Sequence, residues 1–439
     1  MPMNEPTHRL PPGPRGAIRQ TLRYLRDPVG SILDLGRRYG DLFTLSSLGD
    51  ALVVASAPEA VRAIFSAEPD TFAPFAADAM APVLGRGSVL LQHGAAHRRA
   101  RKLMQPPFHG ARMRAYGAAM RDSARTHLAA VPRDRRVPIE DVFRDISLDV
   151  IIRTIFGVST GERMAACARG VRDTIAAFGP LIATFRALQR EFGGFGPWAR
   201  FRRLLGGVHE LLRQEIAARD PARPGDDILS LLVAARDESG AAMDEQEIVE
   251  QLFTMVIAGH ETTATALAWA VDELLRRPEL LGRLREELGP FAGDPDRLAQ
   301  SPLLDAVCAE TLRLHPLIPM VSRKLLRPFE LGGYLLPAGT GLGACLLLAH
   351  LREERYPEAM AFRPQRFLDG KHPPPHEYLP FGGGARRCLG AAFALHEMKV
   401  VLSTLVLEFE LELAAAPART GVRAATIGPR GGVPVVRRR

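Results

Sequence analysis

A glycine-rich stretch with one cysteine carries the clearest chemical signal in the chain. It reads Phe381-Gly-Gly-Gly-Ala-Arg-Arg-Cys388-Leu-Gly390. Consecutive glycines let the backbone adopt positive φ and pass close to a flat ligand, because no Cβ stands in the way. An apolar, helix-periodic run begins at Ala391, so the sulfur would lie at a helix N-terminus, where N–H groups and the helix dipole favour a thiolate. The stretch therefore predicts a metal-binding thiolate; the alternative is a buried, inert cysteine after a flexible turn.

The longest helical signal of the chain must position a second group of reactive side chains. It runs from Asp244, a good N-cap with Glu247 three residues later, to about Arg277, where Pro278 ends it. A helix of that length, about 50 Å, would cross the whole molecule.

The middle of this helix combines small residues with an acid and hydroxyls, in the order Ala258-Gly259-His-Glu261-Thr262-Thr. The small residues would let a bulky group lie against the helix. An acid and a hydroxyl in apolar surroundings cost free energy unless they have a partner or a task. Two interpretations stay open from the residues alone: proton transfer, or a helix in which a threonine hydroxyl bonds back to a carbonyl.

Both segments resemble those of a known family. The pattern Phe-Gly-x-Gly-x-Arg-x-Cys-x-Gly, met at Phe381, Gly382, Gly384, Arg386, Cys388 and Gly390, resembles the haem-binding loop of the cytochrome P450 family, the haem-thiolate monooxygenases. The Ala-Gly-x-Glu-Thr-Thr segment resembles its oxygen-activation segment. The resemblance implies that Cys388 binds the iron of haem b, and that Phe381, Gly382, Gly390, Ala258 and Gly259 contact this cofactor. It also implies that Glu261 and Thr262 form an acid–alcohol pair that passes protons to the reacting oxygen.

Further positions take their expected roles from the same resemblance. His97 and Arg101, spaced i, i+4 on one helical face, would contact a haem propionate together with Arg323 and Arg386. The Glu-x-x-Arg motif of Glu310 and Arg313 would form a structural ionic network with Arg366 beneath the haem loop. The expected substrate pocket is lined by Phe75, Met80, Val83, Leu84, Phe178, Leu181, Thr254, Ala258, Leu317, Ile318, Met320, Val321, Thr426 and Ile427.

Composition limits the function classes. The 439 residues carry a net charge of +8, mostly from arginine, but no basic tract interleaved with aromatic residues, so we expect no nucleic-acid partner. An acidic protein partner fits the charge better, because charge complementarity speeds encounter. The four scattered cysteines indicate a reducing compartment without a disulfide framework. No apolar run reaches the roughly 18 residues of a spanning helix, so we expect no membrane anchor and a cytoplasmic location. In the family that the chain resembles, this implies a soluble member of bacterial type.

The helical patterns along the chain favour a mainly α fold with a small β lobe, and the resemblance implies the triangular prism of the cytochrome P450 family. Residues 1–27 are expected to form an irregular lead-in, and residues 28–439 a single domain. The broken stretch 71–91, with several prolines and glycines, is expected to be a long functional loop without a regular element.

The resemblance implies a monomeric enzyme that inserts one atom of O2 into a hydrophobic small molecule such as a fatty acid, terpenoid, steroid or polyketide. Electrons would come from a ferredoxin or flavodoxin-type donor with its reductase, because the chain has no flavin or nicotinamide domain of its own. A peroxide-driven peroxygenase or a hydroperoxide isomerase is the alternative enzyme, although a family variant that uses peroxide directly lacks the acid–alcohol pair. A haem-based gas carrier or sensor is the alternative outside enzymes, and it has no need of that pair.

Overall fold

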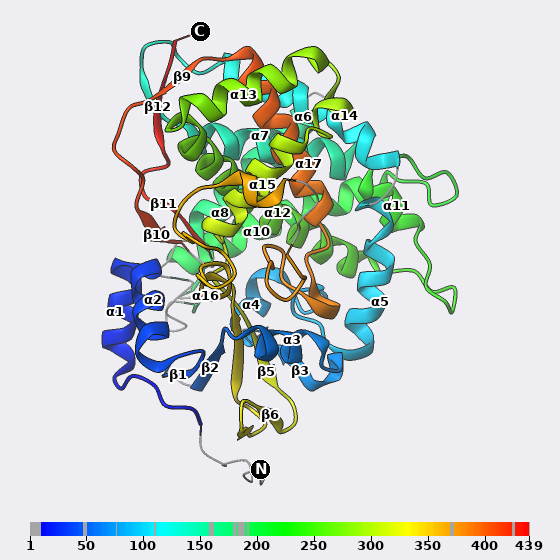
Figure 1. The fold of residues 1–439 in the computed structure, drawn as a ribbon. Helices are drawn as coiled ribbons and strands as arrows, with labels where there is room; N and C mark the ends of the chain where they lie inside the picture. Colours follow the sequence, from blue (N-terminus) through cyan, green and yellow to red (C-terminus); the bar gives the residue numbers. More distant parts are fainter. Residues whose placement is uncertain are drawn as a thin grey trace.

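A large helical body and a smaller lobe built on a five-stranded sheet make up the computed structural model (Figure 1). It describes residues 10–46, 51–75, 77–108, 111–157, 162–178, 182, 189–190, 193–368, 373–423 and 426–438. Its helices are α1 (Ala17–Arg26), α2 (Pro28–Tyr39), α3 (Pro58–Ser66), α4 (Ala77–Leu84), α5 (Gly94–Met104), α6 (Ala111–Ala129), α7 (Ile139–Phe156), α8 (Glu162–Ala177), α10 (Pro197–Ala217), α11 (Ile228–Ala234), α12 (Glu245–Leu275), α13 (Pro278–Leu288), α14 (Pro295–Leu298), α15 (Pro302–Leu314), α16 (Leu346–His350) and α17 (Ala391–Glu408). Its strands are β1 (Leu42–Ser46), β2 (Ala51–Ala55), β3 (Phe72–Pro74), β4 (Arg136–Pro138), β5 (Met320–Leu325), β6 (Phe329–Leu331), β7 (Tyr334–Leu336), β8 (Gly341–Cys345), β9 (Leu411–Leu413), β10 (Thr420–Val422), β11 (Ile427–Pro429) and β12 (Pro434–Arg437).

Helix α12 forms the axis of the helical body, where it packs against α7, α10, α15 and α17. The predicted cap is present, since the Asp244 carboxylate accepts a hydrogen bond of 2.7 Å from the Glu247 amide. The helix ends at Leu275, three residues before Pro278, where α13 starts. Its 31 residues span about 46 Å. The acid and hydroxyl residues at 261 and 262 therefore lie near its middle, inside the molecule.

The five-stranded sheet has the strand order β1-β2-β8-β5-β3, and only the β2–β8 pair is parallel. Strand β8 is buried along its whole length, with glycines at 341 and 343. A Cβ on Gly343 would lie 2.5 Å from the Met320 Sδ, and one on Gly341 would lie 2.4 Å from the Phe75 ring. Phe75 and Met320 thus cover the sheet surface that these glycines leave open. The predicted mainly α fold with a small β lobe is confirmed.

The expectation of an irregular lead-in over residues 1–27 is wrong for residues 17–26, which form α1. The sequence there has no glycine or proline and repeats apolar residues at helical spacing, at Ile18, Leu22 and Leu25. The proline- and arginine-rich residues before Ala17 obscured this periodicity.

The expectation that residues 71–91 lack a regular element is wrong as well. Strand β3 pairs with β5, and α4 forms although Pro82 lies inside it. Proline removes one helical hydrogen bond. Val83 and Leu84, each 4% exposed, anchor the end of α4 in the main apolar core, so packing offsets that loss.

A buried acid in α17 gives the stability of the protein a predictable pH dependence. Glu397 is fully buried, and no described residue is a hydrogen-bond partner of its carboxyl oxygens. Burial raises the pKa of Glu397 to about 8, against which the nearby Ser147 hydroxyl acts. The folded state therefore holds a proton that the unfolded state releases near the ordinary glutamate pKa of 4.5. Stability is thus lost as pH rises from the unfolded towards the folded pKa, by up to about 1.4 kcal/mol per pH unit.

We expect Glu397→Gln to remove this part of the pH dependence and to raise the stability of the protein at neutral pH. Chemical denaturation at a series of pH values from about 5 to 8 measures the effect. The exposed Glu286→Gln on α13 serves as the control, which keeps the wild-type slope. A Glu397→Gln variant with that same slope would contradict the assignment.

Candidate active site

The glycines of the loop before α17 hold a conformation that other residues would not adopt. Gly382 and Gly384 both have φ of 66°. A Cβ on Gly384 would lie 2.3 Å from the backbone oxygen of Phe65 in α3, and one on Gly383 would lie 2.9 Å from the Phe65 ring. The loop therefore rests directly on α3, with no room for side chains between the two.

Cys388 stands at the end of this loop, where its amide donates a hydrogen bond of 3.0 Å to the Phe381 carbonyl. The residue is exposed, yet the surrounding protein raises the pKa of its thiol by burial. The thiol is thus recessed within the protein but accessible to a group placed beside it. The Gly390 amide, Arg101 and Arg387 act in the opposite direction and lower this pKa, but burial outweighs them. The Gly390 amide at the start of α17 thus favours the thiolate, as expected, but burial has the larger effect. Coordination to a metal would supply the missing stabilisation of the thiolate.

The four predicted propionate contacts lie close enough to affect one another electrostatically. Burial, followed by Arg386, Arg101 and Arg323, lowers the pKa of His97 to about 4. Burial and a neighbouring arginine likewise lower the pKa of Arg323 and of Arg386 to about 10. Burial and the neighbouring arginines thus favour the neutral form of His97 at neutral pH. Its imidazole can still donate a hydrogen bond.

This cluster lacks a negative partner within the part of the chain that the structure describes. No carboxylate there forms an ion pair with Arg101, Arg323 or Arg386. Arg323 donates to the Gly383 carbonyl at 3.1 Å, Arg386 donates to the Gln92 carbonyl, and the Arg323 Nε is buried without an acceptor. Buried guanidinium groups without counter-charges are costly, so the cluster fits a ligand that carries carboxylates. The residues present thus fit a group with a metal for Cys388 and carboxylates for the arginines.

The small residues of α12 have two different surroundings. Ala258 is exposed, so the helix presents an accessible surface at this position. Gly259 faces α7 instead, because a Cβ there would lie 2.9 Å from the Ile151 Cδ1. Close packing of the two helices therefore explains the glycine, and a cofactor contact at Gly259 stays a prediction.

Thr262 and Glu261 follow one turn further along α12. The Thr262 hydroxyl donates to the Ala258 carbonyl at 2.7 Å, which is the back-bonding that the structural interpretation of this segment predicts. A hydroxyl that donates its hydrogen still has lone pairs with which to accept another. The back-bond is therefore compatible with proton transfer through the same oxygen.

Glu261 has a partner that sequence reasoning missed. Its carboxylate lies 3.6 Å from the Arg423 guanidinium, which also binds the fully buried Glu140 of α7 at 2.5 Å. Thr265 on α12 donates to the same Glu140 at 2.9 Å. Arg423 follows directly after β10, far from Glu261 in the sequence, so no local pattern could have indicated the contact.

The ionic network of α15 brings together all three residues expected in it. Arg313 binds Glu310 through Nε at 2.6 Å and Nη2 at 2.8 Å, and both side chains are fully buried. Arg366 reaches Glu310 at 3.2 Å. Arg313 also donates to the His350 and Ala361 carbonyls, which ties α15 to the segment that precedes the cysteine loop.

Several residues expected in a substrate pocket are engaged in packing. Val83 and Leu84 are buried in the core, Phe75 and Met320 cover the sheet, and Phe178 packs on Phe201 of α10 with ring centroids 5.1 Å apart. Thr254 is buried, and its hydroxyl lies 2.6 Å from the Glu250 carbonyl and 2.8 Å from the Ser88 hydroxyl. Leu181 lies outside the described residues.

Other expected pocket residues remain accessible or lie beside the cysteine loop. Ile318 is 45% exposed, and Met80, Leu317 and Thr426 are half-buried. The amide of the buried Ile427 donates to the Leu317 carbonyl at 2.8 Å, which joins two expected pocket walls. Val321 approaches Gly382 of the loop to 3.8 Å, measured to a Cβ built on that glycine.

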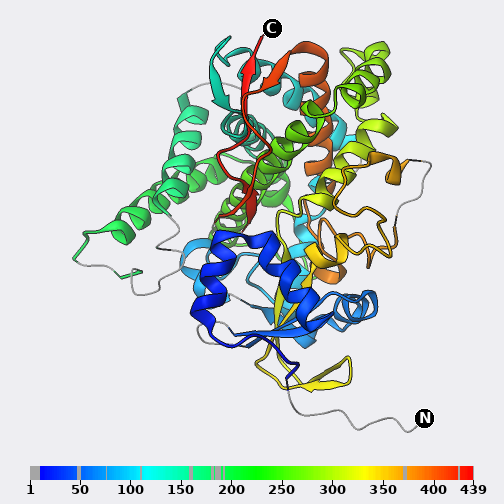
Figure 2. The same cartoon turned by 60° about the vertical axis from the view of Figure 1, so that its left-hand side comes forward.

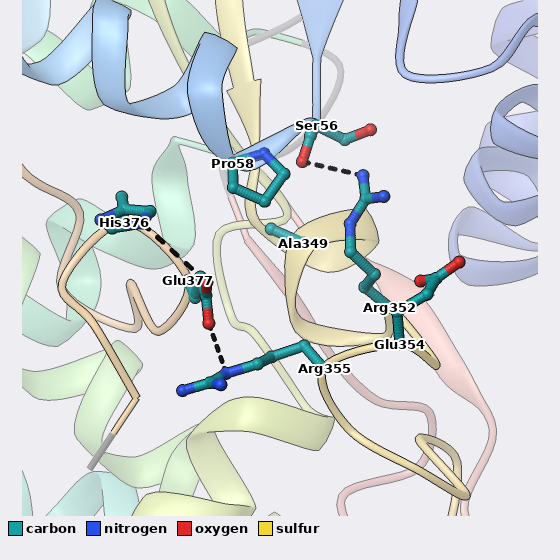
Figure 3. Close-up of a pocket in the computed structure, with 8 residues that line it drawn as sticks. All are labelled: Ser56, Pro58, Ala349, Arg352, Glu354, Arg355, His376 and Glu377. Carbon is teal, nitrogen blue, oxygen red and sulfur yellow. Dashed lines mark hydrogen bonds and ion pairs between the residues drawn. The ribbon is translucent and has the colours of Figure 1, made fainter.

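A polar surface pocket of about 270 Å³ lies apart from these residues (Figure 3). Within it Arg355 binds Glu377, and Arg352 donates to the Ser56 carbonyl at 3.3 Å. None of the candidate site residues lines it. We therefore assign the chemistry to the region around Cys388 and α12.

Comparisons with known proteins agree with this geometry. The cytochrome P450 family model matches residues 11–420. Cytochrome P450 135B1 of Mycobacterium tuberculosis is 38% identical over 410 residues, which cover 92% of this chain and 85% of that protein. Cytochrome P450 137 of the same species is 36% identical over 439 residues, with coverage of 97% and 90%. The solved structure of retinoic acid-bound cyanobacterial CYP120A1 superposes with a TM-score of 0.85 at 25% identity and covers 98% of this chain and 99% of that one. The chain with this cysteine loop and its arginine cluster therefore belongs to the cytochrome P450 family of haem-thiolate monooxygenases.

Proposed function

We propose that the protein uses O2 to oxygenate a hydrophobic small molecule, with electrons from a separate ferredoxin or flavodoxin-type donor and its reductase. One oxygen atom enters a C–H or C=C bond of the substrate. The other leaves as water, with two electrons from NAD(P)H and two protons from solvent. The observation that carries this proposal is the recessed Cys388 thiol beside a cluster of basic side chains that has no carboxylate partner among the described residues.

The cofactor in this proposal is haem b. Cys388 would bind its iron, and Arg101, Arg323 and Arg386, with His97 as a hydrogen-bond donor, would hold the propionates. Bound haem supplies the oxygen chemistry, and electron donation from the cysteine sulfur favours O–O cleavage. The Gly390 amide, which lowers the pKa of Cys388, would limit the charge on that sulfur.

The protein's own part in proton delivery falls to Glu261 and Thr262. Glu261 is one-third exposed, so its carboxyl can exchange protons with solvent. The Thr262 oxygen, fixed by its bond to Ala258, can accept from one neighbour and donate to another by rotation of its hydrogen. A carboxyl and a hydroxyl on successive residues of one helix thus form a short route from solvent towards the reacting oxygen.

The substrate class rests on the accessible apolar residues. Ala258, Leu317 and Ile318 offer aliphatic surface near the cysteine loop and α12, which suits a fatty acid, terpenoid, steroid or polyketide. CYP120A1, similar over nearly the whole chain, was solved with retinoic acid bound. That ligand is itself a hydrophobic molecule, which supports the same class here.

The electron donor would approach on the side of the cysteine loop. A shallow pocket of about 200 Å³ opens there, lined by Phe381, Gly382 and the exposed Arg387 together with residues of α15 and α17. An acidic donor would be attracted to a protein of net charge +8, which raises the rate of encounter.

The proposal is tested with the haem-loaded protein, a ferredoxin, its reductase, NADPH and a hydrophobic compound that shifts the haem spectrum. We expect product with the redox system and an at least tenfold lower yield per NADPH for Thr262→Ala, because the route for protons is broken and oxygen is released as peroxide. Product and peroxide per NADPH are the quantities measured. Thr263→Ala, whose hydroxyl bonds the Gly259 carbonyl at 2.9 Å, is the matched control and keeps the wild-type yield.

Two results would contradict the proposal. Turnover with hydrogen peroxide alone, and none with the redox system, would indicate the peroxygenase instead. An unchanged product yield per NADPH in Thr262→Ala would remove the proton route from Thr262.

A further inference from the structure

Helix α1 turns its apolar side away from the protein. Ile18, Leu22 and Leu25 are 67%, 63% and 50% exposed. Spacings of four and three residues place them on one face of the helix. No residue of α1 is buried. Figures 1 and 2 both show α1 at the periphery of the molecule, beside α2.

The inward side of α1 carries a different set of residues, Ala17, Gln20 and Tyr24. Tyr24 packs against the apolar cluster beneath α2 and the five-stranded sheet, and Gln20 donates to the Pro14 carbonyl at 3.0 Å. In a helix that packs on its own protein core, the apolar stripe faces that core. Here the three aliphatic residues face outward, and no part of the chain that the structure describes buries them.

Arginines flank the outward stripe. Arg19, Arg23 and Arg26 follow one another along one side of it, all exposed, and α1 contains no acidic residue. Arg23 is paired with Asp34 of α2 at 2.9 Å, but no described residue forms an ion pair with Arg19 or Arg26. An apolar stripe beside unpaired positive charge is complementary to a layered surface. The outer layer of such a surface is anionic, and the layer beneath it is apolar.

The size of the stripe favours a lipid surface over a protein. Three aliphatic side chains expose roughly 300 Å² together. A stable protein–protein interface buries about 800 Å² on each partner. A bilayer sets no such minimum, because a short helix can insert its apolar side chains one by one into the boundary between headgroups and acyl chains.

We propose that α1 is a membrane-surface helix that lies flat on an anionic lipid bilayer. Ile18, Leu22 and Leu25 enter the boundary between headgroups and acyl chains, and Arg19 and Arg26 contact the anionic headgroups. The protein then binds the surface without crossing it, which is compatible with the finding that no described helix is long and apolar enough to span a membrane. This inference does not depend on the proposed oxygenation, because it concerns the resting protein.

Flotation of the full-length protein with vesicles tests the proposal. We expect binding to vesicles of equal parts phosphatidylglycerol and phosphatidylcholine, and little binding to pure phosphatidylcholine. Arg19→Gln/Arg26→Gln should weaken binding about twenty-five-fold, since each arginine contributes about fivefold at an anionic surface. The triple variant Ile18→Ser/Leu22→Ser/Leu25→Ser should lose binding. As the matched control, Leu326→Ser/Met360→Ser changes apolar residues of similar exposure elsewhere, 47% and 60%, and should bind like the wild type.

Several outcomes would overturn the proposal. The first is that the wild type does not bind anionic vesicles. The second is that the triple variant binds them as well as the wild type, and the third is that the control loses as much binding as the triple variant. A wild-type dimer that the triple variant converts to a monomer would assign the stripe to a second copy of the chain instead. The haem spectrum of each variant, recorded without vesicles, shows that it is folded.

Discussion

Replacement of Cys388 by serine is expected to abolish the Soret band that thiolate-ligated haem shows when reduced and bound to carbon monoxide, and with it all oxygenation. The physical reason is that serine supplies a weak oxygen ligand in place of a sulfur that donates electron density to the iron. The loop should otherwise keep its shape, because its fold depends on the glycines against Phe65 and on the bond from the residue 388 amide to the Phe381 carbonyl. The measurement is the difference spectrum of the purified variant.

The chain offers a matched control for this substitution. Cys167 is also a free cysteine, half-buried in α8, and burial raises the pKa of its thiol to about 11. Cys167→Ser should therefore leave the band unchanged. A persistent band in Cys388→Ser would show that another side chain binds the iron.

The second large effect is expected in the ionic network beneath the haem loop. Arg313→Ala should destabilise the protein by about 3–5 kcal/mol, because it leaves Glu310 as a buried charge with only Arg366 nearby. It also removes the donors to the His350 and Ala361 carbonyls. Chemical denaturation, followed by helical circular dichroism, gives the change in the free energy of unfolding.

The control for this prediction is an arginine in an exposed network. Arg438 pairs with Asp134 and Glu412 at 2.6 and 2.9 Å, with side chains that are about half exposed. Arg438→Ala should cost no more than about 1 kcal/mol, since solvent screens such pairs. Equal losses in the two variants would mean that burial adds nothing to the Arg313 network.

Local signals in the sequence were enough to predict the elements that carry the site. The cap at Asp244 and Pro278 bounded α12, and the glycines marked the cysteine loop. Each of these signals acts within a few residues, so it can be read without knowledge of the fold. The motifs also predicted the family of the protein, which the comparisons confirm.

Contacts between distant segments could not be predicted in the same way. Helix α4 forms across Pro82 because Val83 and Leu84 pack in the apolar core. Position 259 requires a glycine because Ile151 of α7 lies against it. The raised pKa of Cys388 is a further example, since it depends on how much protein surrounds the loop. In each case the deciding neighbour is remote in the sequence and has no local signature.

Arg423 binds two acids, Glu140 and Glu261, at unequal distances. This difference has a consequence for the motion of Glu261 on α12. The contact of Arg423 with Glu140 is short and buried, whereas its contact with Glu261 is long and partly solvated. If Glu261 rotates away, Arg423 keeps Glu140 as its counter-ion, so no unpaired charge is left in the interior. We therefore expect Glu261 to be the mobile member of the three, able to rotate between Arg423 and solvent while Arg423 stays bound to Glu140.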